Sequence, residues 1–433
     1  MKKTCLLAAG CLAAALPALG FSAPAQSDAS LQQELNQLQL DYNKKLKELE
    51  TRLDQLQQQQ DQAAVAPASG SNKTEAVNSF NPAIALILSG QAAYFSQNPA
   101  NYRMPGFALG DETDPGTEGL SLAESELAIS ADVDNWFYGQ FVLSVTPDNQ
   151  VSVEEAYLDA LHMPAGLGLR FGRLKSGIGY LNDQHSHVWD FIDAPLAYRA
   201  MLNTQYADDG VRLTWLAPTD MFFELGSEVF NGSNYPAAGN AHHGVGGAYT
   251  VYAHFGGDVG VSNSWLAGLS HLSANARDRD SGTLGTFTGE DKVNIADLVW
   301  KWAPNGNPYR HNFKFQTEYL WGTENGTYSG IGDVNNNRRG WYAQAVYQFI
   351  PQWRVGARYG QVSADDPGLL FAGTSLDTAG GTPRRSSLMV DFSNSEFSHI
   401  RLQYNHDQSG PKTNNEVFLQ YVMALGAHGA HAY

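Results

Sequence analysis

Cysteine is almost absent from this sequence. The two cysteines that it contains, Cys5 and Cys11, lie close together at the start of the chain, within a segment that has the features of an export signal. A chain that loses this segment forms no disulfides and has no thiol chemistry.

Long apolar runs are also missing after the first 25 residues. The most apolar candidate, 83–95, is interrupted by Ser89, Gly90 and Gln91, whereas a transmembrane helix needs about 20 consecutive apolar residues. The chain is therefore expected to be either a periplasmic protein or a membrane β-barrel. Its composition of 43 Gly, 20 Tyr, 20 Phe and 9 Trp favours the barrel.

Basic residues are scarce as well. The chain has 27 Lys and Arg against 44 Asp and Glu, which gives a formal net charge of −17. Such an acidic protein is not expected to bind nucleic acid, and its charge favours cations as partners.

Residues 1–25 have the organisation of a signal peptide. Lys2 and Lys3 form a basic start, an apolar stretch follows, and Ala23-Pro24-Ala25 offers a cleavage site of the A-x-A kind. Lipidation of Cys11 is an alternative, although the apolar stretch before it is very short. Both readings predict export.

The segment 26–62 is predicted to form an α-helical coiled coil in the periplasm, followed by a flexible linker over 63–79. Its apolar residues recur at spacings of three and four, which is a heptad seam with one stutter. Because the segment offers this seam nothing else to pack on, we expect self-association, with a homotrimer as the preferred state. The seam consists of Leu31, Leu35, Leu38, Tyr42, Leu46, Leu49, Leu53 and Leu56.

Residues 80–433 are predicted to form an all-β, transmembrane antiparallel barrel of about 16 strands. Short segments alternate between apolar and polar residues, as strands do when one face meets lipid and the other a wet lumen. Their centres lie near residues 89, 126, 141, 156, 170, 212, 226, 250, 265, 297, 316, 345, 358, 389, 402 and 420. Short turns, expected at the periplasmic end, fall at 134–135, 164–165, 218–220, 256–257, 304–308, 351–352 and 394–395. The intervening connections are predicted to be longer, except the one at 147–149.

The longest connection, 176–207, is too apolar and aromatic for a loop in water. We expect it to fold into the lumen against the inner wall and to form the constriction of a pore. The charged residues expected at this constriction are His185, His187, Asp190 and Asp193 of the loop and, by strand parity, Arg170, Arg212, Arg354, Arg358, Glu124 and Glu126 of the wall.

The pair His185 and His187 also suggests a metal site. Imidazoles two residues apart on an extended chain point to one side, and Asp190 and Asp193 could add carboxylate ligands. A hydrogen-bonded structural loop explains the same residues and is the preferred interpretation. The sequence has no phosphate-binding glycine loop, G-x-S-x-G elbow or H-E-x-x-H motif, so neither an enzyme nor a cofactor is predicted.

The layout resembles the phosphate-selective porin O and P family, whose members are sixteen-stranded trimers, some with an N-terminal coiled coil. The best local match is LRFGRLKSGIG at 169–179, which is similar to the strand that leads into the third loop of that family. The resemblance implies a trimeric porin of the Gram-negative outer membrane. Its phosphate selectivity does not carry over, because a phosphate channel needs a ladder of Arg and Lys and basic residues are sparse here.

The sequence therefore predicts an outer-membrane porin for small hydrophilic solutes, with a weak preference for cations. Its predicted surroundings are outer-membrane lipid and lipopolysaccharide. Two alternatives remain open. One is a receptor-like protein that binds a metal or another ligand, and the other is a tether that reaches the cell wall through the coiled coil.

Overall fold

A computed structural model describes residues 82–147, 150–238 and 246–426. The predicted signal peptide, coiled coil and linker lie outside these residues. Among the described residues, no helix combines the length and the apolar character needed to cross a membrane.

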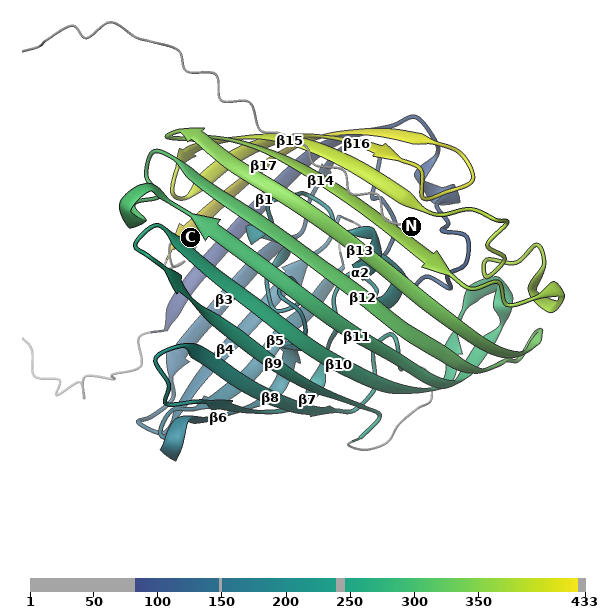
Figure 1. The fold of residues 1–433 in the computed structure, drawn as a ribbon, viewed down its shortest axis with the longest axis horizontal. Helices are drawn as coiled ribbons and strands as arrows, with labels where there is room; N and C mark the ends of the chain where they lie inside the picture. Colours follow the sequence, from purple (N-terminus) through teal and green to yellow (C-terminus); the bar gives the residue numbers. More distant parts are fainter. Residues whose placement is uncertain (1–81, 148–149, 239–245, 427–433) are drawn as a thin grey trace, which may run out of the picture. The chain divides into compact units, whose positions relative to one another are not determined.

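The described residues form one antiparallel sheet that closes on itself (Figure 1). Except for β2 and β3, which both pair with β1, each strand pairs with its neighbour in the chain. The first strand pairs with the last, in a register that joins Ala85 to Gly426 and Phe95 to Glu416. The strands are β1 (Ala83–Phe95), β2 (Gly119–Leu122), β3 (Ser125–Asp132), β4 (Phe137–Val145), β5 (Val151–Ala160), β6 (Leu167–Lys175), β7 (Ala207–Leu216), β8 (Phe222–Phe230), β9 (Ala248–Val259), β10 (Asn263–Asp280), β11 (Thr286–Trp302), β12 (Asn312–Tyr328), β13 (Gly332–Ile350), β14 (Trp353–Ala364), β15 (Arg384–Ser395), β16 (Ser398–Asp407) and β17 (Asn414–Gly426).

Strands β2 and β3 are two parts of one barrel strand. Both pair with β1, and only Ala123 and Glu124 separate them. At the break, the main-chain N–H of Ser89 in β1 donates to the hydroxyl of Ser125, so a side chain replaces a missing ladder bond. The described residues therefore form a barrel of sixteen strands, and the predicted strand count is confirmed. Every predicted centre falls within a strand.

The alternation of the sequence places apolar side chains outside and polar ones inside. In β16, Ile400 and Leu402 are 41% and 51% exposed on the outer face, whereas Arg401 and Gln403 are 2% and 0% exposed on the inner face. A bilayer accepts such an apolar outer face, and a closed barrel leaves the lipid no unpaired backbone groups. The fold is that of a transmembrane β-barrel.

Strands β10 to β13 are 17 to 19 residues long, well beyond the short segments that were predicted. Their hairpins are closed by only 281–285 and 329–331. The expectation that these connections would be long loops is therefore wrong. The polar residues that suggested loops instead extend the antiparallel ladder, because pairing satisfies their backbone groups.

The turn predicted at Gly256-Gly257 is also wrong, because both glycines lie inside β9 and pair with Leu266 and Trp265. A Cβ atom on Gly256 would lie 3.0 Å from the main-chain oxygen of Trp265. This glycine therefore serves close approach within a strand. The turn itself is at 260–262, and the one predicted at 394–395 is at 396–397. The connections at this end of the barrel are 133–136, 161–166, 217–221, 260–262, 303–311, 351–352 and 396–397.

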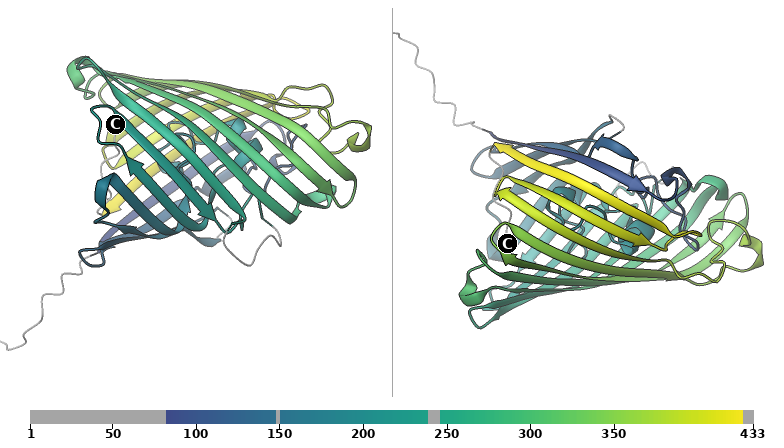
Figure 2. Two further views of the ribbon diagram at one scale, coloured as in Figure 1. Left: turned by 60° about the horizontal axis from the view of Figure 1, so that its bottom comes forward. Right: turned by 90° about the horizontal axis from the view of Figure 1, so that it is seen from above.

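The apolar core lies inside the barrel. Residues 176–206, between β6 and β7, form the inner loop, which enters the lumen and packs on the inner wall (Figure 2). It contains the 3-10 turn η3 (Ser186–Val188) and the helix α2 (Leu196–Leu202). Tyr198, Met201 and Leu202 of α2 are buried among wall residues that include Tyr342 and Val362. The other 3-10 turns are η1 (Pro99–Asn101), η2 (Pro164–Gly166), η4 (Gly282–Leu284), η5 (Pro304–Gly306) and η6 (Leu369–Phe371).

We predict that Leu402→Arg destabilises the folded barrel by about 2–4 kcal/mol, as expected for an arginine placed in the middle of a lipid-facing strand. The measurement is denaturant unfolding in lipid vesicles, with Leu402→Phe as the control that keeps the face apolar. An arginine variant as stable as the control would show that β16 does not face lipid.

Candidate functional site

A single buried carboxylate of the wall holds the first part of the inner loop together with the helix α2. Glu318 of β12 accepts hydrogen bonds from the main-chain N–H groups of Tyr180 (3.2 Å) and Leu181 (3.1 Å) and from the hydroxyl of Tyr198 (2.7 Å). These donors come from both ends of the inner loop, so one side chain holds them together. Nearby, the N–H of Gly177 donates to Glu228 of β8 at 3.0 Å.

Asp193 fixes the second part of the inner loop to strands β14, β15 and β16. Its carboxylate forms ion pairs with Arg358 and Arg385 and accepts a hydrogen bond from Gln403 at 2.6 Å. Arg199 of α2 lies 3.8 Å away. Burial by itself raises the pKa of the Asp193 carboxyl, but the three guanidinium groups outweigh it and hold this pKa below its usual range.

Asp190 makes a second anchor of the same kind. It lies 3.0 Å from Lys314 of β12 and 3.3 Å from Arg354 of β14, and it accepts a hydrogen bond from Gln344 at 3.3 Å. Burial raises the pKa of Asp190, and the charges of Lys314 and Arg354 lower it further than burial raises it. Two aspartates of the inner loop thus neutralise cations from several strands of one wall.

The residues on either side of α2 explain why a short helix forms between these anchors. Pro195 precedes α2, where a residue with a fixed φ and no free N–H is well accommodated. Asn203 ends the helix in the left-handed conformation, with φ of 50°. The short helix places Tyr198 on Glu318 and Arg199 beside Asp193, so the hydrogen-bond and ion-pair anchors share one rigid element.

The opposite side of the inner loop meets the wall in a cluster of histidines and glutamates. Nδ1 of His187 lies 2.8 Å from Glu126, and the ring of His185 lies 3.1 Å from Glu126, 3.4 Å from Glu154 and 3.0 Å from Glu155. Glu124, in the break between β2 and β3, accepts hydrogen bonds from Ser144 (2.7 Å) and Ser186 (2.8 Å).

The charges of this cluster shift the pKa of the His185 ring. Burial and the ammonium group of Lys175 lower the pKa of the His185 ring, but its contacts with Glu126, Glu154 and Glu155 outweigh both and raise this pKa well above its usual value. The cluster therefore favours positive charge on the inner loop at this position.

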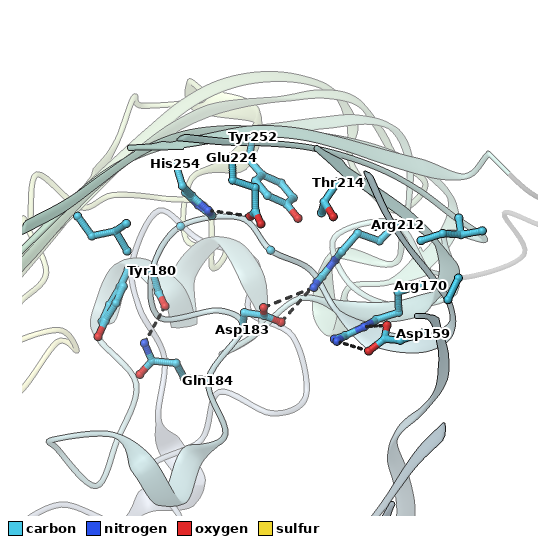
Figure 3. A pocket seen from close by; sticks show the side chains of 16 residues that line it. Asp159, Arg170, Tyr180, Asp183, Gln184, Arg212, Thr214, Glu224, Tyr252 and His254 are labelled. Carbon is cyan, nitrogen blue, oxygen red and sulfur yellow. Dashed lines mark hydrogen bonds and ion pairs between the residues drawn. The ribbon is translucent and has the colours of Figure 1, made fainter. Parts of the chain in front are cut away.

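A cavity of about 440 Å³ lies between the inner loop and strands β5 to β10 (Figure 3). Many of the side chains that line it are polar or charged. Arg170 pairs with Asp159 through two hydrogen bonds of 2.7 and 2.9 Å, and Arg212 lies 3.4 Å from Asp183 of the inner loop. The other polar residues of the lining are Tyr180, Gln184, Thr214, Glu224, Tyr252 and His254.

The structure brings the ten predicted site residues together around the inner loop, but in three separate groups. In the first group, Arg354 contacts Asp190 and Arg358 contacts Asp193. In the second, Arg170 and Arg212 line the cavity. In the third, Glu124 and Glu126 contact the inner loop near the histidines. The prediction that Asp190 and Asp193 supply carboxylate ligands beside the histidines is wrong, because both carboxylates form ion pairs with Lys and Arg side chains of the wall. The carboxylates beside the histidines are Glu126, Glu154 and Glu155.

Several residues that position the loop were not predicted. Glu154 is the extra residue of a β-bulge, since Val142 pairs with Glu155 while Leu143 pairs with Val153. The bulge turns both glutamates toward the lumen, which strict alternation does not allow. Glu318 and Arg385 do occupy strand positions that alternation assigns to the inner face. Their role as anchors of the loop, however, depends on where the loop lies.

The arrangement of a closed transmembrane barrel, a loop folded into its lumen and a charged cavity beside that loop is one that outer-membrane channels share. The chain belongs to the same family as an uncharacterized protein of Aquifex aeolicus (strain VF5), to which it is 31% identical over 342 residues, 73% of this chain and 70% of the relative. No family model matches the sequence.

Solved structures with the same fold include the outer membrane channel DcaP of Acinetobacter baumannii, with a TM-score of 0.53, 12% identity and coverage of 80% of this chain and 97% of that one. A loop-deletion mutant of OmpT, an outer membrane protein of Vibrio cholerae, has a TM-score of 0.52 at 10% identity, covering 80% and 99%. OprB of Pseudomonas putida has a TM-score of 0.51 at 12% identity, covering 79% and 94%. At these identities the likeness establishes the fold, and the resemblance to phosphate-selective porins stays a prediction.

We predict that Asp193→Asn destabilises the protein by about 3–5 kcal/mol, because it leaves buried arginines without their counter-charge. The matched control is Asp183→Asn on the same loop. The Asp183 side chain is 44% exposed and its ion pair with Arg212 is long, so its loss is expected to cost less than about 1 kcal/mol. Unfolding midpoints of the two variants in detergent give the comparison, and equal midpoints would contradict the anchor.

The effect of Asp193→Asn should also depend on pH in one direction. A carboxyl whose folded pKa is lowered stabilises the fold fully above its unfolded pKa of about 3.9, and this contribution is lost as pH falls toward the folded value. The difference between wild type and variant should therefore be constant from neutral pH to about 5 and shrink below about 4.

Proposed function

We propose that this protein is a porin of the Gram-negative outer membrane, through which small hydrophilic solutes diffuse. The observation that carries the proposal is the charged cavity beside the inner loop. A barrel of sixteen strands is wide enough for a water-filled passage, and here part of its interior stays polar and accessible.

The inner loop forms the constriction of this channel. Its anchors to β12, β14, β15 and β16 through Glu318, Asp190 and Asp193 hold it against one wall. Solutes then pass on its other side, through the cavity that the inner loop shares with strands β5 to β10. Asp159, Asp183 and Arg170 are partly exposed there, and they set the local field.

A weak preference for cations follows from the distribution of accessible charge. Arg338, Arg358, Arg385 and Arg401 are buried in ion pairs with acids, so they offer little to a passing anion. The cavity carries Asp159, Asp183 and Glu224 against Arg170, Arg212 and a histidine. The excess of acid is small, which supports a mild selectivity.

The predicted setting completes the proposal. The chain assembles as a homotrimer through the coiled coil 26–62, which extends into the periplasm, and the barrel is surrounded by outer-membrane lipid and lipopolysaccharide. The apolar outer face of the barrel supports the membrane setting.

We expect stepwise conductance in planar bilayers, with a reversal potential of mild cation preference under a salt gradient. Because the chain without its signal has no cysteine, Gln184→Cys gives a single thiol at the cavity, and a charged methanethiosulfonate reagent should reduce the current. Val390→Cys, on the outer face of β15, is the control that should not respond. Silent bilayers would contradict the porin, and strong anion preference would favour the phosphate type.

The tether remains a second candidate, based on the predicted coiled coil. Deletion of residues 31–60 separates it from the porin. We expect the pores to persist and the trimer to weaken, as measured by conductance and by native mass in detergent. If the deletion leaves both unchanged but detaches the outer membrane from the cell wall, tethering is the main role of the segment.

A further inference from the structure

Three metal-ligand side chains meet where the inner loop crosses to β3. They are Glu126 of β3 and His185 and His187 of the inner loop, and one donor atom from each lies within 4.8 Å of the other two. Glu126 contacts both rings, with Oε1 2.8 Å from Nδ1 of His187 and Oε2 3.1 Å from Nδ1 of His185. The two rings are 5.6 Å apart and tilted by 31°.

These separations are close to those in the first coordination sphere of a small divalent cation. Ligand atoms about 2.1 Å from a tetrahedral Zn²⁺ ion lie about 3.4 Å from one another. The two Glu126–histidine distances, 2.8 and 3.1 Å, are slightly shorter than this. One donor atom from each of the three residues lies within 4.8 Å of the others, so an outward shift of the side chains would admit an ion. Imidazole nitrogen with one carboxylate oxygen suits Zn²⁺ and its neighbours better than Mg²⁺ or Ca²⁺.

The second ring nitrogen of His185 supports the same assignment. Its Nε2 lies 3.0 Å from Glu155, so the ring is oriented by a carboxylate behind it, as metal-bound histidines usually are. Nδ1, on the side that faces Glu126 and His187, is buried and has no partner in hydrogen-bonding geometry among the described residues. A ring held in this way presents a donor atom toward the space that it shares with the other two ligands.

Lys175 limits the number of protein ligands. Its ammonium group lies 2.7 Å from Glu154, which is itself 3.4 Å from His185. Because Lys175 occupies Glu154, Glu126 and the two histidines are the ligands that remain. Three protein ligands leave a coordination position for water, the arrangement of an open site.

We propose that Glu126, His185 and His187 bind one divalent transition-metal ion of the Zn²⁺ class, which clamps the inner loop to β3. The site goes beyond the proposed function, because binding requires no conduction. It also differs from the metal site expected from sequence, in which Asp190 and Asp193 were the carboxylates.

The test uses the chain without its signal, folded in detergent, and Zn²⁺ in competition with a chromophoric chelator. We expect one ion per chain, and at least a tenfold loss of affinity in His185→Gln and in Glu126→Gln. His254→Gln is the matched control, since this histidine also faces a glutamate, Glu224, at 3.6 Å, but on the cavity side. A second control, His428→Gln with His431→Gln, removes the histidines of the C-terminal tail and should leave the affinity unchanged.

A variant that gains a spectroscopic signal distinguishes a lost metal site from a misfolded protein. His187→Cys introduces the only cysteine of the chain without its signal, and with Co²⁺ it should give a thiolate-to-cobalt absorption that Co²⁺ with wild type lacks. Unchanged Zn²⁺ affinity in His185→Gln, or His187→Cys without this absorption, would overturn the proposal. The cluster would then be an imidazolium paired with glutamates.

Discussion

The structure depends on the closure of the sheet between β1 and β17. A lipid bilayer offers no hydrogen-bonding partners, so a strand edge left open in the membrane would leave a row of N–H and C=O groups unsatisfied. The pairing from Ala85 with Gly426 to Phe95 with Glu416 removes that edge. Closure over sixteen strands also makes the interior too wide for opposite walls to pack on each other. The inward side chains must therefore find partners elsewhere, and the inner loop supplies many of them.

The inner loop divides the lumen into two unlike halves. On the side of β12 to β16, its aspartates and the wall arginines neutralise each other in buried pairs, and the apolar side chains of α2 pack beneath them. On the side of β3 to β7, the contacts are made by histidines and glutamates, and charged groups line a cavity. Partly exposed charges of the lumen, such as Asp159, Arg170 and Asp183, lie on this second side. The proposed conduction path and the proposed metal site both lie on this second side, although neither requires the other.

Much of the barrel could be predicted from local pattern. Alternation identified all sixteen strands, because each faces lipid on one side and a polar interior on the other. The length of β10 to β13 was missed, since polar residues beyond the apolar band look the same in a loop and in a paired strand. Gly256-Gly257 was misread as a turn because glycine also serves close packing within a sheet. For the site, the sequence predicted that the loop enters the lumen and that the charged wall residues face inward. It did not predict which of these residues form ion pairs and hydrogen bonds with each other.

The sequence by itself determined that the chain forms a closed barrel and that 176–207 cannot be an ordinary exposed loop, because both follow from residue type at short range. Only the tertiary structure decided which charges meet. Asp190 and Asp193 lie close in sequence to the histidines, yet they contact Arg354, Arg358 and Arg385. A bulge at Glu154 brings a second glutamate of β5 to His185. Partner choice depends on how the loop crosses the lumen. Some of its partners lie far away in the chain, such as Arg358, 165 residues from Asp193, and no local pattern encodes that path.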